Sequence, residues 1–315
     1  METTEELSYS KANLNRRWGV YLIDLFCIFF FTFILFALEN MIVKNVPSYL
    51  NLTSEKSKLK VESKLYLEDE KDIVTYANAN LKTYEEKKDF LSVRIDYFYK
   101  DTNFFTDSKS LEEYNLRKLE AKNQGNNLFL KEDDKIVENN LNPELLYNFY
   151  VTEINEHCLP LLFNSEVYTY STKVLFLIQV SEFSIGLVIS FVCFKVIIPL
   201  TCFKKGRQSL GMKVFKISYV QLDGFNIKTS KYLFKSLFDL IVMYFVSFVS
   251  FLLPVFVSIG MMYFTKTNQN LSEYVFNVYL VDSKDDEIYF DYLDYQDKKE
   301  SSKKASIENK DLRLE

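Results

Sequence analysis

Three long apolar segments constrain the fold more than any other feature of this 315-residue sequence. Residues 25–38 carry no charge, and extending the run back to residue 18 adds only one ionisable side chain, Asp24. Further apolar regions cover residues 174–203, interrupted by Glu182 and a lysine, and residues 240–264. About 20 apolar residues cross the hydrocarbon core of a bilayer as a helix. The sequence therefore predicts an α-helical integral membrane protein.

The side of the membrane on which the tail lies is left open. Residues 237–264 are too few for two complete crossings at about 20 residues each. One crossing would leave the tail outside, whereas a helical hairpin or re-entrant turn broken at Pro254 would return it to the cytoplasm. For the first segment the rival interpretation is a signal peptide, but the long apolar run and the lack of a small-x-small cleavage site before Glu39 favour an uncleaved anchor.

Charged residues set the expected orientation. Residues 204–236 carry eight lysine or arginine residues against one acid, whereas residues 47–172 carry 16 against 23. Cytoplasmic loops are rich in lysine and arginine, so we expect a multi-pass protein of the cell membrane with a cytoplasmic N-terminus. The expected segments are the N-terminus (1–17), transmembrane helix 1 (18–43), an extracellular insert (44–173), transmembrane helix 2 (174–203), a basic cytoplasmic connector (204–236), transmembrane segment 3 (237–264) and a polar tail with short strands (265–315).

The extracellular insert has the pattern of a small α+β module. The Asn-Pro-Glu run at 142–144 is typical of a helix start, and we expect that helix to end at Pro160. Residues 127–139 predict two short strands around a charged Glu-Asp-Asp turn. Residues 110–122 have helical charge spacing. The insert holds one cysteine, Cys158, so it is not a disulfide scaffold.

The remaining composition argues against several kinds of site. His157 is the only histidine, which leaves little room for a His-ligated metal or for Ser-His-Asp or Cys-His catalysis. Cys158 is its neighbour, but adjacent residues of a helix point about 100° apart, so we expect two structural residues. A net charge of −5 and the lack of a phosphate-binding loop argue against nucleic-acid and nucleotide binding. We expect no enzyme, no metal and no cofactor.

The basic connector contains a predicted β-hairpin. Residues 214–220 alternate in polarity, Asp223-Gly224 is typical of a tight turn, and residues 225–227 would form a short returning strand. Residues 270–281 should start in a turn and finish as a strand. The cations of the connector also suit anionic lipid headgroups, although setting the topology is their plainer role.

Four stretches occur in an order that resembles a known family. Residues 15–24 (NRRWGVYLID) combine arginines with an aspartate inside the first span, and residues 206–220 (GRQSLGMKVFKISYV) combine two glycines with a strand. An Asp-Gly turn with a basic SKYLFK stretch follows, and NLSEYVFNVYLV (270–281) closes the series. Together they resemble the RDD family of small bacterial membrane proteins. The residues at its motif positions are Arg17, Asp24, Gly206, Ser209, Gly211, Lys213 and Glu273.

The resemblance covers about residues 1–45 and 174–283, and it has departures. Ser209 stands for a threonine of the family, Glu273 for its second aspartate and Lys235 for an arginine. The family's first loop is short, so the insert lies outside its usual pattern. The resemblance implies a membrane protein whose biochemical role is mostly undefined, with cation transport proposed for some members.

Ionisable residues inside the apolar segments are the candidate functional residues, because such groups are costly in a membrane and are usually paired. Asp24, Lys195 and Asp239 should lie at similar depth near the cytoplasmic side, so we expect a polar cluster. In the alternative, Lys195 snorkels to the interface and Asp239 is interfacial. Arg17 and Asp24 are about 10 Å apart along their helix and should not pair directly.

Two functions remain open, and we expect the first rather than the second. In the first, the cluster transports a cation or proton, which would require a homo-oligomer because three segments are few for a pathway. In the second, the chain is a non-enzymatic structural, sensory or interaction protein, anchored in the lipid bilayer and acting through its insert.

Overall fold

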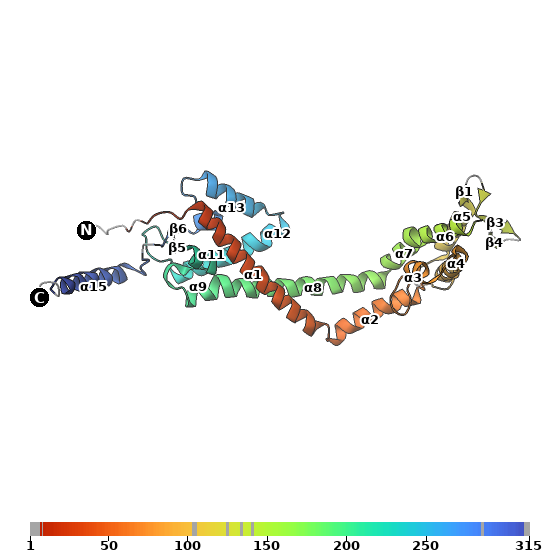
Figure 1. Ribbon diagram of the computed structural model, residues 1–315, viewed down its shortest axis with the longest axis horizontal. Helices are drawn as coiled ribbons and strands as arrows, with labels where there is room; N and C mark the ends of the chain where they lie inside the picture. Colours follow the sequence, from red (N-terminus) through yellow and green to blue (C-terminus); the bar gives the residue numbers. More distant parts are fainter. Residues whose placement is uncertain are drawn as a thin grey trace. The chain divides into compact units, whose positions relative to one another are not determined.

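The computed structural model describes residues 7, 9–102, 106–123, 126–132, 135–139, 142–284 and 287–311, and it is mostly helical (Figure 1). The chain divides into two compact units. Residues 1–39 and 182–315 form one unit, and residues 40–181 form the other.

Three helical stretches are long and apolar enough to cross a membrane, as the sequence predicts. The first is α1 (Leu14–Val43). The second runs without interruption through α8 (Glu166–Val192), the π-helical segment η2 (Cys193–Ile197) and α9 (Ile198–Thr201). The third combines α11 (Thr229–Phe238), the π-helical segment η4 (Asp239–Val246) and α12 (Ser247–Val249). The second and third stretches each begin eight residues earlier than predicted, because their flanking polar residues also take up helical structure.

The third stretch is followed by a break and a short apolar helix, α13 (Leu253–Phe264). The backbone turns at Phe251 and Leu252, both with positive φ. Pro254 therefore lies in the first turn of α13, where its missing N–H is tolerated, and the break precedes it. Helix α13 packs on η4, and the Tyr263 hydroxyl near its end accepts a hydrogen bond from Trp18 Nε1 at 3.0 Å. The chain thus turns back toward the start of α1.

A small antiparallel sheet forms where the connector meets the tail. Strand β5 (Ile217–Val220) pairs with β6 (Tyr279–Asp282), and Lys11 bridges to Val281. The predicted hairpin of the connector is therefore wrong in its pairing. Residues 214 and 215 belong to helix α10 (Leu210–Phe215), and only one bridge, from Val220 to Asn226, joins β5 to the returning segment. The Asp-Gly turn itself is present, since Gly224 N–H donates to Gln221 O at 3.0 Å.

Both the connector and the tail contain helices as well as a strand. Helix η3 (Lys205–Arg207) precedes α10, α14 (Leu271–Val275) precedes β6, and α15 (Tyr292–Asp311) follows it. The prediction that residues 270–281 start in a turn and finish as a strand is confirmed, with the turn extended into α14.

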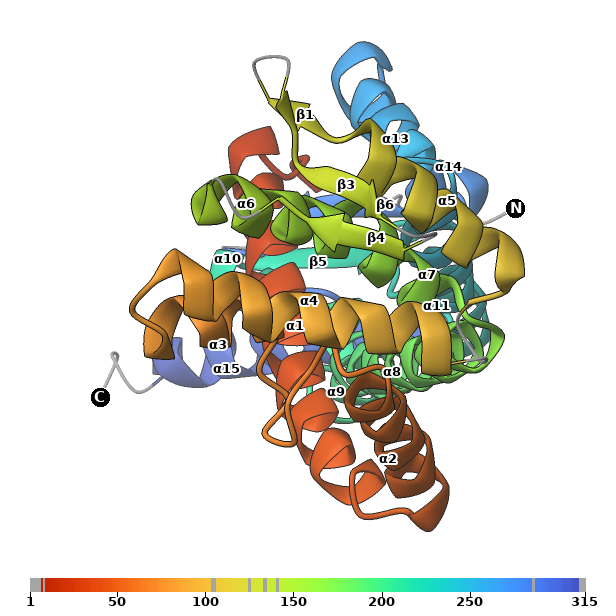
Figure 2. The ribbon, with the colours of Figure 1, turned by 90° about the vertical axis from the view of Figure 1, so that its right-hand side faces the viewer.

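The 40–181 unit is a helical module (Figure 2), and its buried apolar side chains form a core of their own. Its helices are α2 (Pro47–Glu62), α3 (Ile73–Asn80), α4 (Tyr84–Asp101), α5 (Ser108–Glu120), α6 (Pro143–Glu153), the π-helical segment η1 (Ile154–Cys158) and α7 (Leu159–Asn164). Two small hairpins are present, β1 (Lys122–Asn123) with β2 (Asn126–Asn127) and β3 (Phe129–Glu132) with β4 (Lys135–Glu138). The second of these was predicted, although Asp133 and Asp134 of its turn lie outside the described residues. Helix α4 packs on α6 through Leu91, Ile95, Phe98, Leu146 and Tyr150, which are all buried.

Local sequence explains where α6 starts but not where it ends. The Asn142 side chain accepts hydrogen bonds from Glu144 N–H and Leu145 N–H, as the helix-start pattern predicts. The prediction that Pro160 ends this helix is wrong. Leu159 N–H makes a π-type hydrogen bond to Ile154 O, and helical structure continues through α7 although Pro160 has no N–H to donate.

Candidate functional site

Asp24 of α1 is 3% exposed and accepts three hydrogen bonds. Lys195 Nζ donates to its Oδ2 atom at 2.6 Å, and Ser209 Oγ donates to the same oxygen at 2.5 Å. The Gly211 N–H donates to Oδ1 at 2.8 Å. One buried carboxylate of α1 is therefore joined to two segments that lie 171 and 185 residues further along the chain, η2 and the start of α10.

The sequence around Ser209 forms half of this site. Ser209 is the N-cap of α10, and its hydroxyl accepts from Met212 N–H at 3.3 Å while it donates to Asp24. A Cβ atom on Gly211 would lie 2.5 Å from Val20 O and 3.0 Å from Asp24 Oδ1. Only glycine lets this backbone approach α1 closely enough to donate to the carboxylate.

Lys195 is held through its backbone as well as its ammonium group. Its carbonyl lies four residues before Pro199, which has no N–H to donate to it. The Tyr232 hydroxyl donates to that carbonyl at 2.8 Å, and Ser236 Oγ lies 3.4 Å from it. Helix α11 thus supplies the hydrogen bond that the Lys195 carbonyl lacks within its own helix. This contact fixes the level at which the Lys195 ammonium meets Asp24.

Asp239 belongs to a different ion pair. Its Oδ2 atom accepts from Lys235 Nζ, one helical turn earlier, at 2.7 Å. Lys235 is 3% exposed, and its ammonium nitrogen lies 4.7 Å from the centre of the Tyr219 ring. The structure brings Asp24 and Lys195 together, and it places Asp239 with Lys235 instead.

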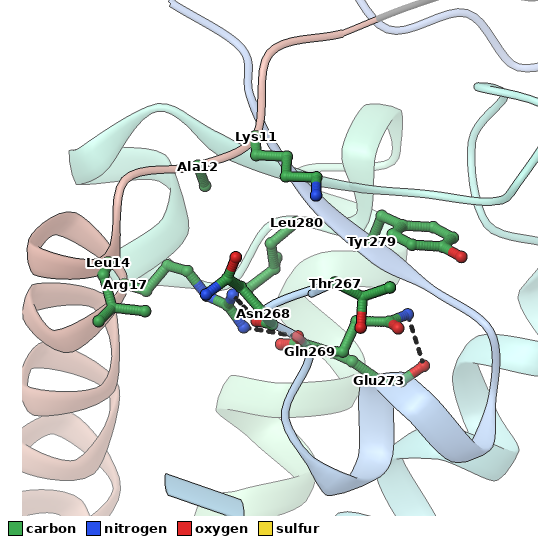
Figure 3. A pocket seen from close by; sticks show the side chains of 10 residues that line it. All are labelled: Lys11, Ala12, Leu14, Arg17, Thr267, Asn268, Gln269, Glu273, Tyr279 and Leu280. Carbon is green, nitrogen blue, oxygen red and sulfur yellow. Dashed lines mark hydrogen bonds and ion pairs between the residues drawn. The ribbon is translucent and has the colours of Figure 1, made fainter. Parts of the chain in front are cut away.

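A second buried pair joins the start of α1 to the tail (Figure 3). Arg17 Nη2 donates to Glu273 Oε2 at 2.5 Å, and the two side chains are 4% and 0% exposed. Asn270 is the N-cap of α14 and donates to both oxygens of Glu273, through N–H at 3.0 Å and through Nδ2 at 2.8 Å. Arg17 and Asp24 do not pair with each other, as their spacing predicts.

The other motif positions differ in role. Gly206 has φ +74°, and its N–H donates to Asn226 Oδ1 at 3.1 Å, which orders the chain just before α10. Lys213 is exposed, with its ammonium 5.5 Å from the centre of the Phe203 ring. The contact of Arg17 with Glu273 was not anticipated, although the Asn-x-x-Glu spacing at 270–273 is a readable capping-box pattern.

Glu182 is a further buried acid inside an apolar helix. It is 6% exposed, and its Oε2 atom has no hydrogen-bond partner among the described residues. A buried carboxylate oxygen without a hydrogen-bond donor costs free energy in apolar surroundings. Glu182 therefore differs from Asp24, whose charge is matched by a cation and two further donors.

The 40–181 unit contains a buried polar network around Glu153. Arg117 donates to both carboxylate oxygens of Glu153, at 3.0 and 2.6 Å, and the Tyr99 hydroxyl donates to it at 2.8 Å. Cys158 is fully buried, and burial raises the pKa of its thiol. An unreactive thiol of this kind agrees with the structural interpretation of the His157-Cys158 pair.

Within the described part of the chain, no group of three or more histidine, cysteine, aspartate or glutamate side chains could hold a metal ion. No protein-family model matches the sequence, and no curated protein or solved structure matches it.

Proposed function

We propose that the chain is an RDD-like integral membrane protein that acts as a non-enzymatic anchored interaction protein. Its N-terminus and residues 204–236 face the cytoplasm, and residues 44–173 form an extracellular recognition module. The sheet of Lys11, β5 and β6 supports a common side for the N-terminus, the connector and the tail. Two sets of contacts between motif residues support the family resemblance. Arg17 contacts Glu273, and Asp24 contacts Ser209 and Gly211.

The observation that carries the proposed role is the coordination of both oxygens of Asp24. Both carboxylate oxygens accept short hydrogen bonds, and Lys195 supplies the matching charge. Releasing this carboxylate to a passing ion would require breaking the ion pair and two further hydrogen bonds. The geometry therefore favours a structural role for Asp24, in which its contacts hold the connector against the first helix. The separate core of residues 40–181 suits a module that such an anchor displays.

Two measurements test this proposal. In intact cells, a membrane-impermeant maleimide should label Lys109→Cys in the insert but not Lys213→Cys in the connector, in a background without the native cysteines. Both positions are exposed, so labelling reports the side of the membrane. In proteoliposomes, the purified chain should carry no proton, sodium or potassium flux. Labelling at both positions contradicts the topology, and a flux that Asp24→Asn abolishes in a folded protein contradicts the role.

Glu182 favours a second candidate function, the transport of a proton. Its Oε2 atom is buried without a hydrogen-bond partner among the described residues, whereas both oxygens of Asp24 already accept hydrogen bonds. This function predicts proton flux that Glu182→Gln abolishes and that survives deletion of the insert. A transporter with so few segments would act as a homo-oligomer.

A further inference from the structure

A cavity of about 150 Å³, lined by both polar and apolar side chains, lies at the start of α1 (Figure 3). The segment before α1 forms one wall, and the loop before α14 together with β6 forms the other. Its lining includes the charged side chains of Lys11, Arg17 and Glu273 and the polar side chains of Thr267 and Gln269. The volume corresponds to about five water molecules at liquid density, which is enough for a tetrahedral group of five heavy atoms.

Arg17 brings an unused donor to this cavity. The side chain is 3% exposed, and two of its nitrogens are occupied, by Glu273 and by the carbonyl of Asn268. Its Nε atom is buried and has no hydrogen-bond partner among the described residues. A buried donor without an acceptor costs about 1–3 kcal/mol, so an acceptor inside the cavity would be stabilising.

The charge balance favours an anion as that acceptor. Lys11 and Arg17 contribute two positive charges against the single carboxylate of Glu273, whose oxygens already accept from Asn270 and Arg17. Lys11 is exposed and donates once, to Lys266 O at 3.2 Å, which leaves further N–H groups for a ligand. We propose that this cavity binds a phosphate group, held by Arg17 Nε and by the ammonium of Lys11.

We expect the phosphate group to come from a phospholipid headgroup rather than from free phosphate in solution. Trp18, which follows Arg17 in the sequence, donates a hydrogen bond to the Tyr263 hydroxyl, and such aromatic side chains gather at the headgroup level of membranes. The uncharged part of α1 begins one residue after Asp24. This source rests on the membrane insertion proposed above, whereas binding of phosphate from solution does not.

The test uses the purified full-length chain in detergent micelles and native mass spectrometry. Three probes are compared: dioctanoyl phosphatidic acid, inorganic phosphate and dioctanoylglycerol, which has no phosphate. Phosphatidic acid should bind saturably, and dioctanoylglycerol should not. Lys11→Gln should weaken binding about fivefold, because one surface cation near an anionic headgroup contributes about 1 kcal/mol. Lys204→Gln is the matched control, since it removes an exposed lysine that does not line this cavity and should leave the affinity unchanged.

Each outcome decides the proposal. Inorganic phosphate that binds as tightly as phosphatidic acid, with the same dependence on Lys11, supports the phosphate site and identifies solution as its source. Equal binding of dioctanoylglycerol, or equal weakening by Lys11→Gln and Lys204→Gln, overturns it. Arg17→Lys keeps the positive charge but removes Nε. In protein whose folding is verified by Trp18 fluorescence, this variant should bind phosphatidic acid more weakly than Lys11→Gln does. The maleimide experiment tests membrane orientation independently of this result.

Discussion

The contact between Asp24 and Lys195 predicts a strong energetic coupling between two residues 171 positions apart. Replacing one partner leaves the other as an unmatched charge. Removing one member of a buried ion pair costs about 3–5 kcal/mol. Because the Lys195 side chain is 23% exposed, we expect the lower end, about 3 kcal/mol of unfolding free energy, for Asp24→Asn and for Lys195→Met.

The double variant separates this coupling from general damage. With both charges absent, no unmatched charge remains, and the loss should be about 4 kcal/mol rather than the additive sum of about 6. The coupling free energy is then about 2 kcal/mol. The double variant should still be less stable than the native protein, because Ser209 and the Gly211 N–H also lose the carboxylate that they contact.

Unfolding in mixed micelles with increasing sodium dodecyl sulfate provides the assay. Trp18 is the only tryptophan and lies in α1, so its fluorescence follows the unit that contains the pair. Lys213→Met is the control, because this exposed lysine has no ion-pair partner in the described part of the chain, and its effect should stay within about 0.5 kcal/mol. Strictly additive losses in the double variant would refute the pairing.

Three further predictions concern other parts of the chain. In the same micelle assay, Gly211→Ala should lower the free energy of unfolding by at least about 2 kcal/mol, since its Cβ would clash with α1. Gly260→Ala should instead raise the free energy of unfolding by about 0.5–1 kcal/mol, because a Cβ at this helical position has nothing within 4 Å. Cys202, which is exposed, should react with maleimide in the native protein, whereas Cys158 should react only after unfolding, as mass spectrometry of the labelled peptides would report. Burial alone would raise the pKa of Asp96, but Lys118 and Lys100 outweigh it and lower that pKa. The resulting stability is present above the unfolded pKa of about 3.9 and is lost as pH falls through the folded value, so the destabilisation caused by Asp96→Asn, measured by circular dichroism, should shrink below about pH 4.

Local patterns predicted the elements whose determinants are close together in sequence. The three apolar stretches, the Asn142 cap and the β3–β4 hairpin depend on neighbouring residues, and each was predicted correctly. Helix α10 was missed because its start depends on Ser209, whose hydroxyl is held by Asp24 from 185 positions away. The partner of β5 was missed because β6 lies about 60 residues further along the chain.

The candidate site was predictable only in part, for a related reason. Position along the apolar helices predicts that Asp24 and Lys195 lie at one level, because Asp24 is near the start of the first and Lys195 near the end of the second, which runs the opposite way. Depth does not distinguish Asp239, which reaches Lys235 within its own helix and needs no other partner. The contact of Arg17 with Glu273 joins residues 256 positions apart, and it depends on how the tail turns back after α13.

The sheet that joins Lys11, β5 and β6 has a consequence for synthesis of the protein on the ribosome. Residues 40–181 hold their own core, so the insert can fold as soon as it emerges. The other unit cannot close then, because Glu273 and β6 are made last. Until residue 282 has left the ribosome, Arg17 lacks its acid and β5 lacks its strand partner. A chain truncated before residue 271 would therefore keep the core of residues 40–181 but could not complete the other unit.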